Sequence, residues 1–387
     1  MRIALVRQRY NPYGGAERFI GRALPALERA GAQVTLIARN WEAKSGEDWG
    51  ARRVLRADPF YVGNLWRDWS FARAARAAWR AAAFDLVQSH ERIPGCDVYR
   101  AGDGVHRRWL EIRRAGAGAL ERLGIALNPY HRYVCMAERR MFEHPRLRAV
   151  ICNSRMVRDE IAQAFRVAPE KLHLIYNGVD LEHFHTARRG ALRAAARAEL
   201  GAGADETIFL FVGSGFARKG LDAAIGALAR GAGERWRLVV AGRDRAADRF
   251  AAQARASGVG ERVQFAGGRE DVRPLYAAAD CFILPTRYDP FPNTALEALA
   301  MGLPAIVGRR SGAAEIVEPG VNGWTCDPAD IPGLARLMRE AASAVRRGGM
   351  DVAARMCAER YGIDRMARQL TDLYAALEAR TQERTKQ

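Results

Sequence analysis

Short apolar runs alternate with amphipathic segments from the first residues of the chain onward. Residues 3–6 and 34–38 are apolar runs of the kind that form strands buried on both faces. Between them, residues 16–30 place apolar side chains on one face of a helix, and Gly31 is suited to end that helix. The pattern predicts a strand, a helix and a second, parallel strand.

The same alternation continues in two separate series. Strand-like runs of the first series follow at 84–87, 149–152 and 172–176. Those of the second series lie at 208–213, 237–242, 263–265, 281–285 and 305–307. Strands that alternate with helices form parallel sheets with helices on both faces. We therefore predict an α/β protein of two doubly wound, Rossmann-like domains that face each other across a cleft.

The domain boundaries follow from composition. The first domain is predicted over 1–180 and the second over 181–362, because residues 185–206 are rich in Ala and Arg, lack a strand pattern and suit a connection. Residues 363–380 carry an apolar stripe at helical spacing and are predicted to return to the first domain as a helix. The tail, 381–387, is predicted to be disordered.

The overall composition is that of a folded protein of the cytosol. The 387 residues are 49% hydrophobic, which excludes a mostly disordered chain. No apolar run approaches the roughly 18 residues needed to span a bilayer, and the N-terminus lacks the features of a signal peptide. The six cysteines are scattered, with no C-x-x-C pair and no His at zinc spacing, so we expect buried thiols and neither disulfides nor a metal.

The first of three motifs that follow predicted strands contains Gly14 and Gly15. Two glycines at the start of a helix let backbone amides approach an anion, where the helix dipole is positive. A dinucleotide fingerprint is excluded, because G-x-G-x-x-G is absent. A turn that only joins strand to helix is an equally good interpretation of this motif.

The second motif is the glycine-rich turn 213–220, which contains Arg218 and Lys219. Adjacent cations in a turn after a parallel strand suit a diphosphate, and open α/β sheets bind ligands at this end. It is not a P-loop, whose Lys follows the second glycine. A solvated basic turn is the alternative.

The third motif surrounds the predicted start of a helix at Asn293, where the amides of Asn293, Thr294 and Ala295 would face a phosphate. Asp289 before this helix and Glu297 within it would place two carboxylates beside that phosphate. An ionised carboxylate accepts hydrogen bonds from two neighbouring hydroxyls, so one could hold a sugar and the other a ribose diol.

Together these motifs resemble those of the retaining glycosyltransferases of family 4, which have the GT-B fold. The family signature is Glu, seven residues, Glu, and residues 293–298 are similar to its second half. Residues 95–103, 216–220 and 268–272 resemble segments of lipopolysaccharide core glucosyltransferases. The resemblance covers nearly the whole chain. It implies a UDP-sugar donor, a phosphorylated glycolipid of the lipopolysaccharide core as acceptor, and no metal or other cofactor.

The resemblance also implies residue roles. Glu297 would hold the donor ribose, while Arg218 and Lys219 would hold the diphosphate, with Gly15 against it. Arg269, in the third similar segment, would also contact the donor. Asp103 would lie near the reacting sugar from the first domain, although a structural Asp in its Gly-Asp-Gly turn is an equal alternative.

One departure from the family bears on the sugar. Asp289-Pro290 stands where the family usually has Glu-Gly, and Asp is one methylene shorter while Pro removes an N–H and fixes φ. The donor sugar is therefore predicted only as a hexose, with glucose and N-acetylglucosamine as the candidates. The family mechanism is a front-face attack assisted by the leaving phosphate, whose developing charge the cations and helix amides would stabilise. Asp103 and Asp289 are the candidate catalytic residues.

The charge suggests where the enzyme works. The chain has 61 Lys and Arg against 44 Asp and Glu, a formal net charge of +17. Segment 105–143 interleaves arginines with apolar and aromatic residues, as an interfacial membrane contact requires. The predicted membrane or acceptor contacts are Arg107, Arg108, Trp109, Arg113 and Arg114. We therefore predict peripheral association with the cytoplasmic face of the inner membrane. An ordinary solvated helical hairpin is the alternative.

Two further functions are compatible with parts of the sequence. A nucleic-acid-binding protein would explain the pI near 10.2, but no RNP-like, helix-turn-helix or zinc-finger pattern accompanies it, and no nucleic-acid partner is predicted. A sugar-nucleotide epimerase of the same fold would leave the basic segment unexplained.

Overall fold

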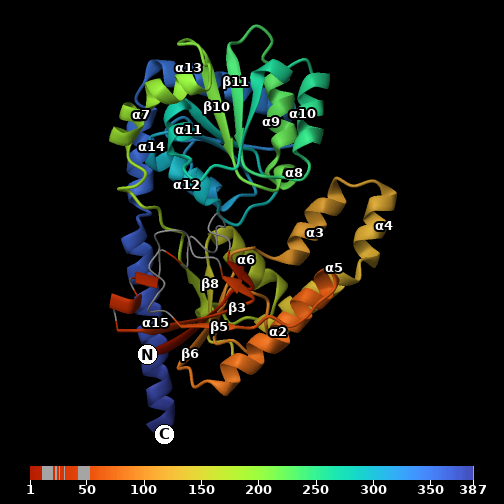
Figure 1. Ribbon diagram of the computed structural model, residues 1–387, viewed down its shortest axis with the longest axis vertical. Coiled ribbons are helices and arrows are strands. Elements are labelled where there is room, and N and C mark those ends of the chain that lie inside the picture. Colours follow the sequence, from red (N-terminus) through yellow and green to blue (C-terminus); the bar gives the residue numbers. More distant parts are fainter. Residues whose placement is uncertain (11–20, 22–23, 26, 30, 42–52, 387) are drawn as a thin grey trace. The chain divides into compact units, whose positions relative to one another are not determined.

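The computed structural model describes residues 1–386 except 11–20, 22–23, 26, 30 and 42–52. It divides into two compact α/β units (Figure 1): the first is Met1–Gly178 with Ile363–Gln387, and the second is Val179–Gly362. Val179 and Asp180, predicted for the first domain, belong to the second unit, in which the Val179 N–H donates to Tyr361 O at 3.0 Å.

The sheet of the first unit contains, among the described residues, seven parallel strands in the order β5-β3-β1-β6-β7-β8-β9. The strands are β1 (Arg2–Val6), β3 (Gln33–Ala38), β5 (Arg53–Arg56), β6 (Leu86–Ser89), β7 (Val98–Arg100), β8 (Ala149–Cys152) and β9 (Leu172–Leu174). A separate two-stranded sheet pairs β2 (Arg9–Tyr10) with β4 (Asn40–Trp41).

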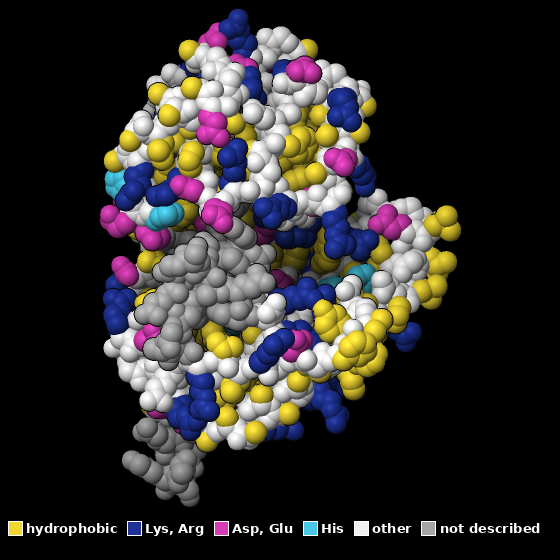
Figure 2. All heavy atoms as spheres, viewed as in Figure 1, with side chains coloured by type: hydrophobic (Ala, Val, Ile, Leu, Met, Phe, Trp, Pro, Cys, Tyr) yellow, Lys and Arg dark blue, Asp and Glu magenta, His cyan; other side chains and the backbone are white. Residues whose placement is uncertain are grey.

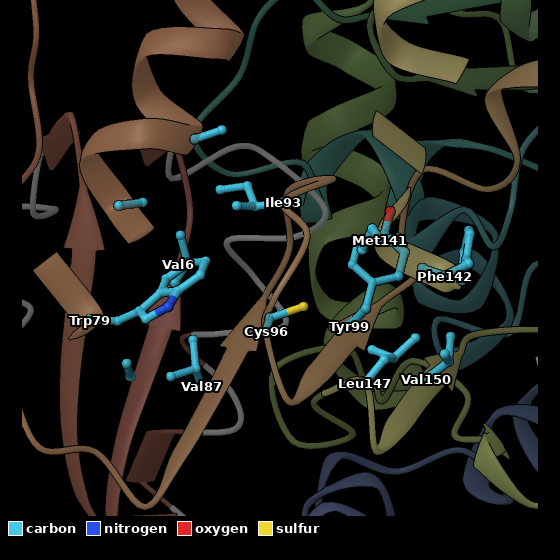
Figure 3. Packing of buried hydrophobic residues seen from close by; sticks show 14 of the residues in the cluster. Val6, Trp79, Val87, Ile93, Cys96, Tyr99, Met141, Phe142, Leu147 and Val150 are labelled. Carbon is cyan, nitrogen blue, oxygen red and sulfur yellow. The ribbon is translucent and has the colours of Figure 1, made fainter. Parts of the chain in front are cut away.

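Each strand of this sheet contributes to two cores, because successive side chains point to opposite faces. Val6 belongs to a core that also contains Trp79 and Tyr99 (Figure 3). Its neighbour Leu5 belongs to the core on the other face, with Tyr374 near the C-terminus. Burial on both faces is why the strands are continuous apolar runs.

Helices whose bounds the described residues give in the first unit are α2 (Gly63–Ala81), α3 (His106–Ala115), α4 (Ala119–Leu127), α5 (Pro129–Phe142), α6 (Arg155–Ala164) and α15 (Ile363–Lys386), with a 3₁₀ turn, η1 (Pro169–Lys171), before β9. The basic segment predicted over 105–143 therefore forms three consecutive helices, α3 to α5. The helix predicted over 16–30 lies largely outside the described residues.

Helix α15 packs on the first unit through its predicted apolar stripe. Buried in the core are Met366, Leu370, Leu373, Tyr374 and Leu377. The helix is assigned as far as Lys386, within the segment 381–387 that the sequence predicts to be disordered. Residues 381–386 contain Gln, Glu, Arg and Lys but neither Gly nor Pro, and good helix formers extend an existing helix at little cost.

The sheet of the second unit contains, in the described chain, six parallel strands in the order β12-β11-β10-β13-β14-β15. They are β10 (Thr207–Val212), β11 (Trp236–Ala241), β12 (Val263–Gly267), β13 (Cys281–Leu284), β14 (Ala305–Gly308) and β15 (Gly323–Cys326). The doubly wound prediction is confirmed for this unit as for the first. Strands β5, β7 and β15 were not predicted, because their sequences, RVLR, VYR and GWTC, are not continuous apolar runs.

The helices of the second unit are α7 (Thr186–Glu199), α8 (Phe216–Lys219), α9 (Leu221–Ala229), α10 (Ala247–Ala256), α11 (Arg273–Ala278), α12 (Asn293–Ala300), α13 (Ile331–Arg347) and α14 (Met350–Glu359). Two 3₁₀ turns complete it, η2 (Gly260–Arg262) and η3 (Gly312–Glu315). Helices α9 and α10 lie on one side of the sheet, and α7, α11 and α12 lie on the other (Figure 1).

Residues 185–206, predicted as a connection, include a full helix of the second unit. Helix α7 packs on α11, and Arg193 and Arg197 hold the carboxylate of Asp280 with N–O distances of 2.5 and 3.2 Å. The prediction missed α7 because arginines rather than a wide apolar stripe attach it to the unit.

The cysteines are free thiols, as predicted. All are buried except Cys135, which is half-buried. Burial raises the pKa of the Cys96 and Cys326 thiols to about 12, so these thiols stay protonated. Within the described part of the chain, no helix is both long enough and apolar enough to cross a bilayer.

Candidate active site

The predicted donor residues of the second unit lie at the carboxyl ends of β10 and β13, which are adjacent in the sheet. The turn after β10 approaches its neighbours so closely that only glycine fits at two points. A Cβ on Gly242 would lie 2.2 Å from Gly213 O, and a Cβ on Gly220 would lie 2.0 Å from Pro285 O. Gly220 also has a φ of +78°, in the left-handed region that glycine favours.

Hydrogen bonds join this turn to the loop after β13. The carbonyl of Arg218 accepts from Arg287 N at 2.9 Å and from Thr286 Oγ1 at 3.1 Å. The Arg287 guanidinium donates to both carboxylate oxygens of Asp222, at 2.9 and 2.6 Å. These hydrogen bonds raise the pKa of Arg287. The two loops therefore form one structure although they are about 70 residues apart in sequence.

Three of the predicted residues converge where these loops meet. Lys219 Nζ lies 3.3 Å from Asp289 Oδ2, and Arg218 Nη1 lies 3.5 Å from the same oxygen. The side chains of Lys219 and Asp289 are only 11% and 9% exposed, whereas that of Arg218 is 36% exposed. Arg218 Nη1 also donates to Tyr288 O at 2.8 Å. Two cations thus share one carboxylate, which leaves a positive local balance suited to an anion.

Helix α12 begins at Asn293, as predicted, beside this cluster. Pro292 occupies the N-cap position without a side-chain cap. The amide of Ala295 donates to Pro292 O at 3.1 Å, and Thr294 Oγ1 donates to Val212 O at 3.3 Å. The Ala295 amide, predicted to face a phosphate, therefore already donates to a carbonyl at the start of the helix.

Glu297 is fully buried one turn into α12. Tyr276 Oη donates to Thr294 O at 3.0 Å and lies 3.3 Å from Glu297 Oε2. His183 is near enough for the Glu297 carboxylate to act on its pKa, which burial lowers overall. Sequence reasoning missed Tyr276 and His183, because neither belongs to a motif and only the fold brings them beside Glu297.

Arg269 is not joined to this cluster. Its Nε donates to Ala266 O at 3.1 Å, and its Nη2 lies 3.4 Å from Glu199 Oε1 at the end of α7. The prediction of a donor contact therefore rests on resemblance alone. Gly14 and Gly15 lie outside the described residues.

In the first unit, Asp103 lies in an exposed turn after β7. Its Oδ2 is 3.9 Å from Arg92 Nη1, and its side chain is 57% exposed. Arg92 also donates to Gly104 O at 3.0 Å and to the fully buried Glu138 at 2.9 Å. Glu138 accepts from the backbone N–H of His106 at the start of α3. Arg92 and Glu138 thus fix the turn that carries Asp103.

The donor cluster combines side chains whose chemistry suits an anion with one that suits hydroxyl groups. Two of its three charged side chains are cations, and the described residues include no group of three or more His, Cys, Asp and Glu placed to hold a metal. A buried carboxylate on the next helix, Glu297, adds a hydroxyl acceptor. This combination suits a phosphorylated ligand that also carries hydroxyl groups.

Known proteins identify the family. Residues 13–183 match the family model described as Glycosyltransferase Family 4, and residues 193–344 match the model described as Glycosyl transferases group 1. A probable transglycosylase of Burkholderia thailandensis is 30% identical over 367 residues, covering 94% of this chain and 93% of the relative. The chain belongs to glycosyltransferase family 4.

A further relative agrees with this assignment, and solved structures share the fold. The lipopolysaccharide glucosyltransferase WaaG of Escherichia coli is 26% identical over 321 residues, covering 82% of this chain and 83% of the relative. The crystal structure of a WaaG involved in lipopolysaccharide biosynthesis matches with a TM-score of 0.83 at 24% identity, covering 96% and 99% of the two chains. Anabaena HepE in complex with UDP and glucose matches with a TM-score of 0.72 at 22% identity, covering 97% and 99%. The predicted GT-B fold is confirmed.

This glycosyltransferase carries its predicted membrane residues on α3. Arg107 and Arg108 are 71% and 43% exposed and both lie near Glu111. Arg113 Nη2 lies 3.2 Å from Glu121 on α4, and Arg114 is exposed. Trp109 is half-buried. The positive charge of this surface is therefore partly neutralised by glutamates that the prediction did not weigh.

Apolar side chains accompany these arginines. On α4, exposed leucines are Leu120, Leu123 and Leu127, and Figure 2 shows hydrophobic atoms gathered along this outer edge of the first unit. A second exposed apolar group, which sequence reasoning missed, lies at the start of α2, the helix that packs on α5. It consists of Phe60, Val62, Leu65, Trp66 and Trp69. The spacing of three and four residues among Val62, Leu65, Trp66 and Trp69 was the signal that could have found most of this group.

Proposed function

We propose that this glycosyltransferase transfers a hexose, glucose or N-acetylglucosamine, from a UDP-sugar to the inner core of lipopolysaccharide, with retention of anomeric configuration. The observation that carries the donor part is the convergence of Arg218, Lys219 and Asp289 within 3.5 Å at the end of β10, beside the buried Glu297. The acceptor part is supported by the likeness to the lipopolysaccharide glucosyltransferase WaaG.

In the proposed donor complex, each group meets the part of the donor that suits its charge. Arg218 and Lys219 bind the diphosphate, and Glu297, steadied by Tyr276, accepts hydrogen bonds from the ribose diol. Asp289 accepts from hydroxyls of the sugar. The complex of HepE with UDP and glucose supports UDP as the nucleotide, because that protein has the same fold.

The proposed chemistry proceeds without a resident metal or other cofactor. The leaving phosphate gains negative charge as its bond to the sugar breaks, and the two cations with the first amides of α12 stabilise that charge. Asp103 is the candidate beside the acceptor hydroxyl in the first unit. Arg92 and Glu138 fix the turn that carries Asp103, so the role proposed for this pair is to position Asp103.

We further propose that helices α2, α3 and α4 place the enzyme on the cytoplasmic face of the inner membrane. Exposed arginines beside exposed Leu and Trp side chains suit an anionic bilayer, because the arginines attract its headgroups and the apolar groups enter its interface. The phosphorylated acceptor lies in the same surface.

The donor site is tested by calorimetric titration of UDP, with GDP, ADP and phosphate as comparisons. Wild type is expected to bind UDP in the micromolar range, and Glu297→Ala is expected to lose about 10-fold or more, because the ribose hydroxyls lose a buried charged acceptor. Glu261→Ala, at an exposed glutamate before β12, is the control and should bind like wild type. Equal UDP affinity in Glu297→Ala would remove the ribose assignment, and preference for GDP or ADP would overturn the choice of UDP.

Replacing Arg107, Arg108, Arg113 and Arg114 with Ser is expected to weaken binding to vesicles of anionic lipid by at least about 10-fold, since each arginine near the surface contributes roughly 1 kcal/mol. Cosedimentation measures vesicle binding, and UDP affinity should not change. The matched control removes the same charge from exposed arginines of the second unit: Arg245, Arg249, Arg346 and Arg347. Unchanged vesicle binding in the α3 variant would contradict the membrane proposal.

A further inference from the structure

The carboxylate of Asp289 forms ion pairs with both cations that are proposed to hold the donor diphosphate. Lys219 Nζ and Arg218 Nη1 both point to the same oxygen, at 3.3 and 3.5 Å. An anion that binds these cations must therefore compete with a carboxylate that belongs to the protein. This observation bears on which anions the site accepts.

The positions of Asp289 and Lys219 are both restrained by their surroundings. The backbone of Asp289 is tied on both sides, because its N–H donates to Arg310 O at 3.1 Å and its carbonyl accepts from Gly312 N at 3.0 Å. The Lys219 side chain lies against Gly213, where a Cβ would come within 2.8 Å of it. The short Asp side chain can rotate, but the carboxylate stays within reach of the cations.

Displacing the Asp289 carboxylate has a cost that depends on the ligand. The side chain is only 9% exposed, so a carboxylate that loses both cations is left largely out of water, which is unfavourable unless new hydrogen bonds replace them. A nucleoside diphosphate alone offers its ribose hydroxyls, which the proposed site directs to Glu297, and brings no further hydroxyl donor next to the phosphates. A nucleotide diphosphate that carries a sugar brings hydroxyl donors next to the phosphate.

We propose that Asp289 is an internal counter-anion of the donor site, displaced by the diphosphate and then held by the hydroxyls of the sugar. This inference rests on the proposed function and gives a physical reason why the site would distinguish a UDP-sugar from UDP. The site favours the UDP-sugar over UDP and over free phosphates, so that after transfer the carboxylate returns to Lys219 and Arg218 and helps to expel UDP. The shorter Asp, in place of the family's Glu, stays close to the cations.

Calorimetric titration of Asp289→Asn with UDP, UDP-glucose, UDP-N-acetylglucosamine and inorganic pyrophosphate tests the proposal. The amide is nearly the same size but carries no charge, so UDP and pyrophosphate are expected to bind about 10-fold tighter than to wild type. UDP-sugar affinity should rise less or fall, which lowers the ratio of UDP-sugar to UDP affinity. Asp205→Asn is the matched control, because it removes the same charge from an exposed aspartate paired with Arg235.

Asp289→Glu restores the charge on a side chain one methylene longer and should return pyrophosphate affinity part of the way to the wild-type value. Thermal melting checks that each variant is folded. Unchanged or weaker binding of UDP and pyrophosphate by a folded Asp289→Asn variant overturns the counter-anion. The proposed function fails separately: if pyrophosphate binding tightens but no protein binds UDP, the counter-anion stands and the UDP assignment falls. If neither wild type nor Asp289→Asn binds pyrophosphate, the anion site and the inference are both overturned.

Discussion

Replacing Lys219 with Ala is expected to lower the rate of sugar transfer by about 10² to 10³-fold, as the loss of one preorganised donor to a developing oxyanion does in other enzymes. Lys219 is almost buried and lies against the glycine-rich turn, so its ammonium is already in place before the phosphate gains charge. The measurement is steady-state transfer from UDP-glucose or UDP-N-acetylglucosamine to a lipopolysaccharide core acceptor.

The division of the loss between kcat and KM is informative. Because the ammonium meets more negative charge in the transition state than in the bound donor, kcat should fall more than KM rises. Lys171→Ala, at a lysine of the first unit outside the proposed site, is the control and should keep wild-type kinetics. A Lys219→Ala enzyme with wild-type kcat would contradict the role assigned to this residue.

The fold could be predicted from the sequence where a single physical cause produces the pattern. Strands β1, β8 and β13 are buried on both faces, so each is a continuous apolar run that stands out from its surroundings. Helix α7 was not predicted because ion pairs attach it to the unit. Arg193 and Arg197 contact Asp280, and such a contact leaves no apolar stripe in the sequence.

The site was predictable in parts but not as a whole. Turn glycines, adjacent cations and a helix start are local signals, and they correctly marked Arg218, Lys219 and Asn293 as neighbours of a strand end. The contact of Lys219 with Asp289 depends instead on the sheet order, which places β10 beside β13 although β11 and β12 come between them in sequence. Tyr276 has no local signal at all, because its partner Glu297 lies on another helix.

The departure of this chain from the family pattern now has a physical interpretation. From sequence, Asp289 was only a shorter version of a sugar-binding Glu. In the structure its carboxylate lies beside the cations. The change of one methylene therefore concerns the diphosphate as well as the sugar, and the proposed selectivity for UDP-sugar over UDP depends on it.

Gly220→Ala is expected to destabilise the protein by about 3 kcal/mol or more, since a left-handed Ala costs roughly 1–2 kcal/mol and the new Cβ adds a clash with backbone. The Cβ would lie 2.0 Å from Pro285 O, and neither loop can retreat without breaking the hydrogen bonds of Arg218 with Thr286 and Arg287. Thermal unfolding should show a midpoint about 6–12 °C lower, at roughly 2–4 °C per kcal/mol for a domain of this size.

Gly233→Ala separates the two causes of this loss. Gly233 has a φ of +82°, close to that of Gly220, but nothing lies within 4 Å of its Cβ position. It should therefore show only the backbone cost, about 1–2 kcal/mol. Equal losses in the two variants would mean that the close approach of the β10 and β13 loops does not hold the turn in place. A larger loss at Gly220, together with weaker UDP binding by the folded fraction, would mean that the same approach keeps Arg218 and Lys219 at the donor phosphates.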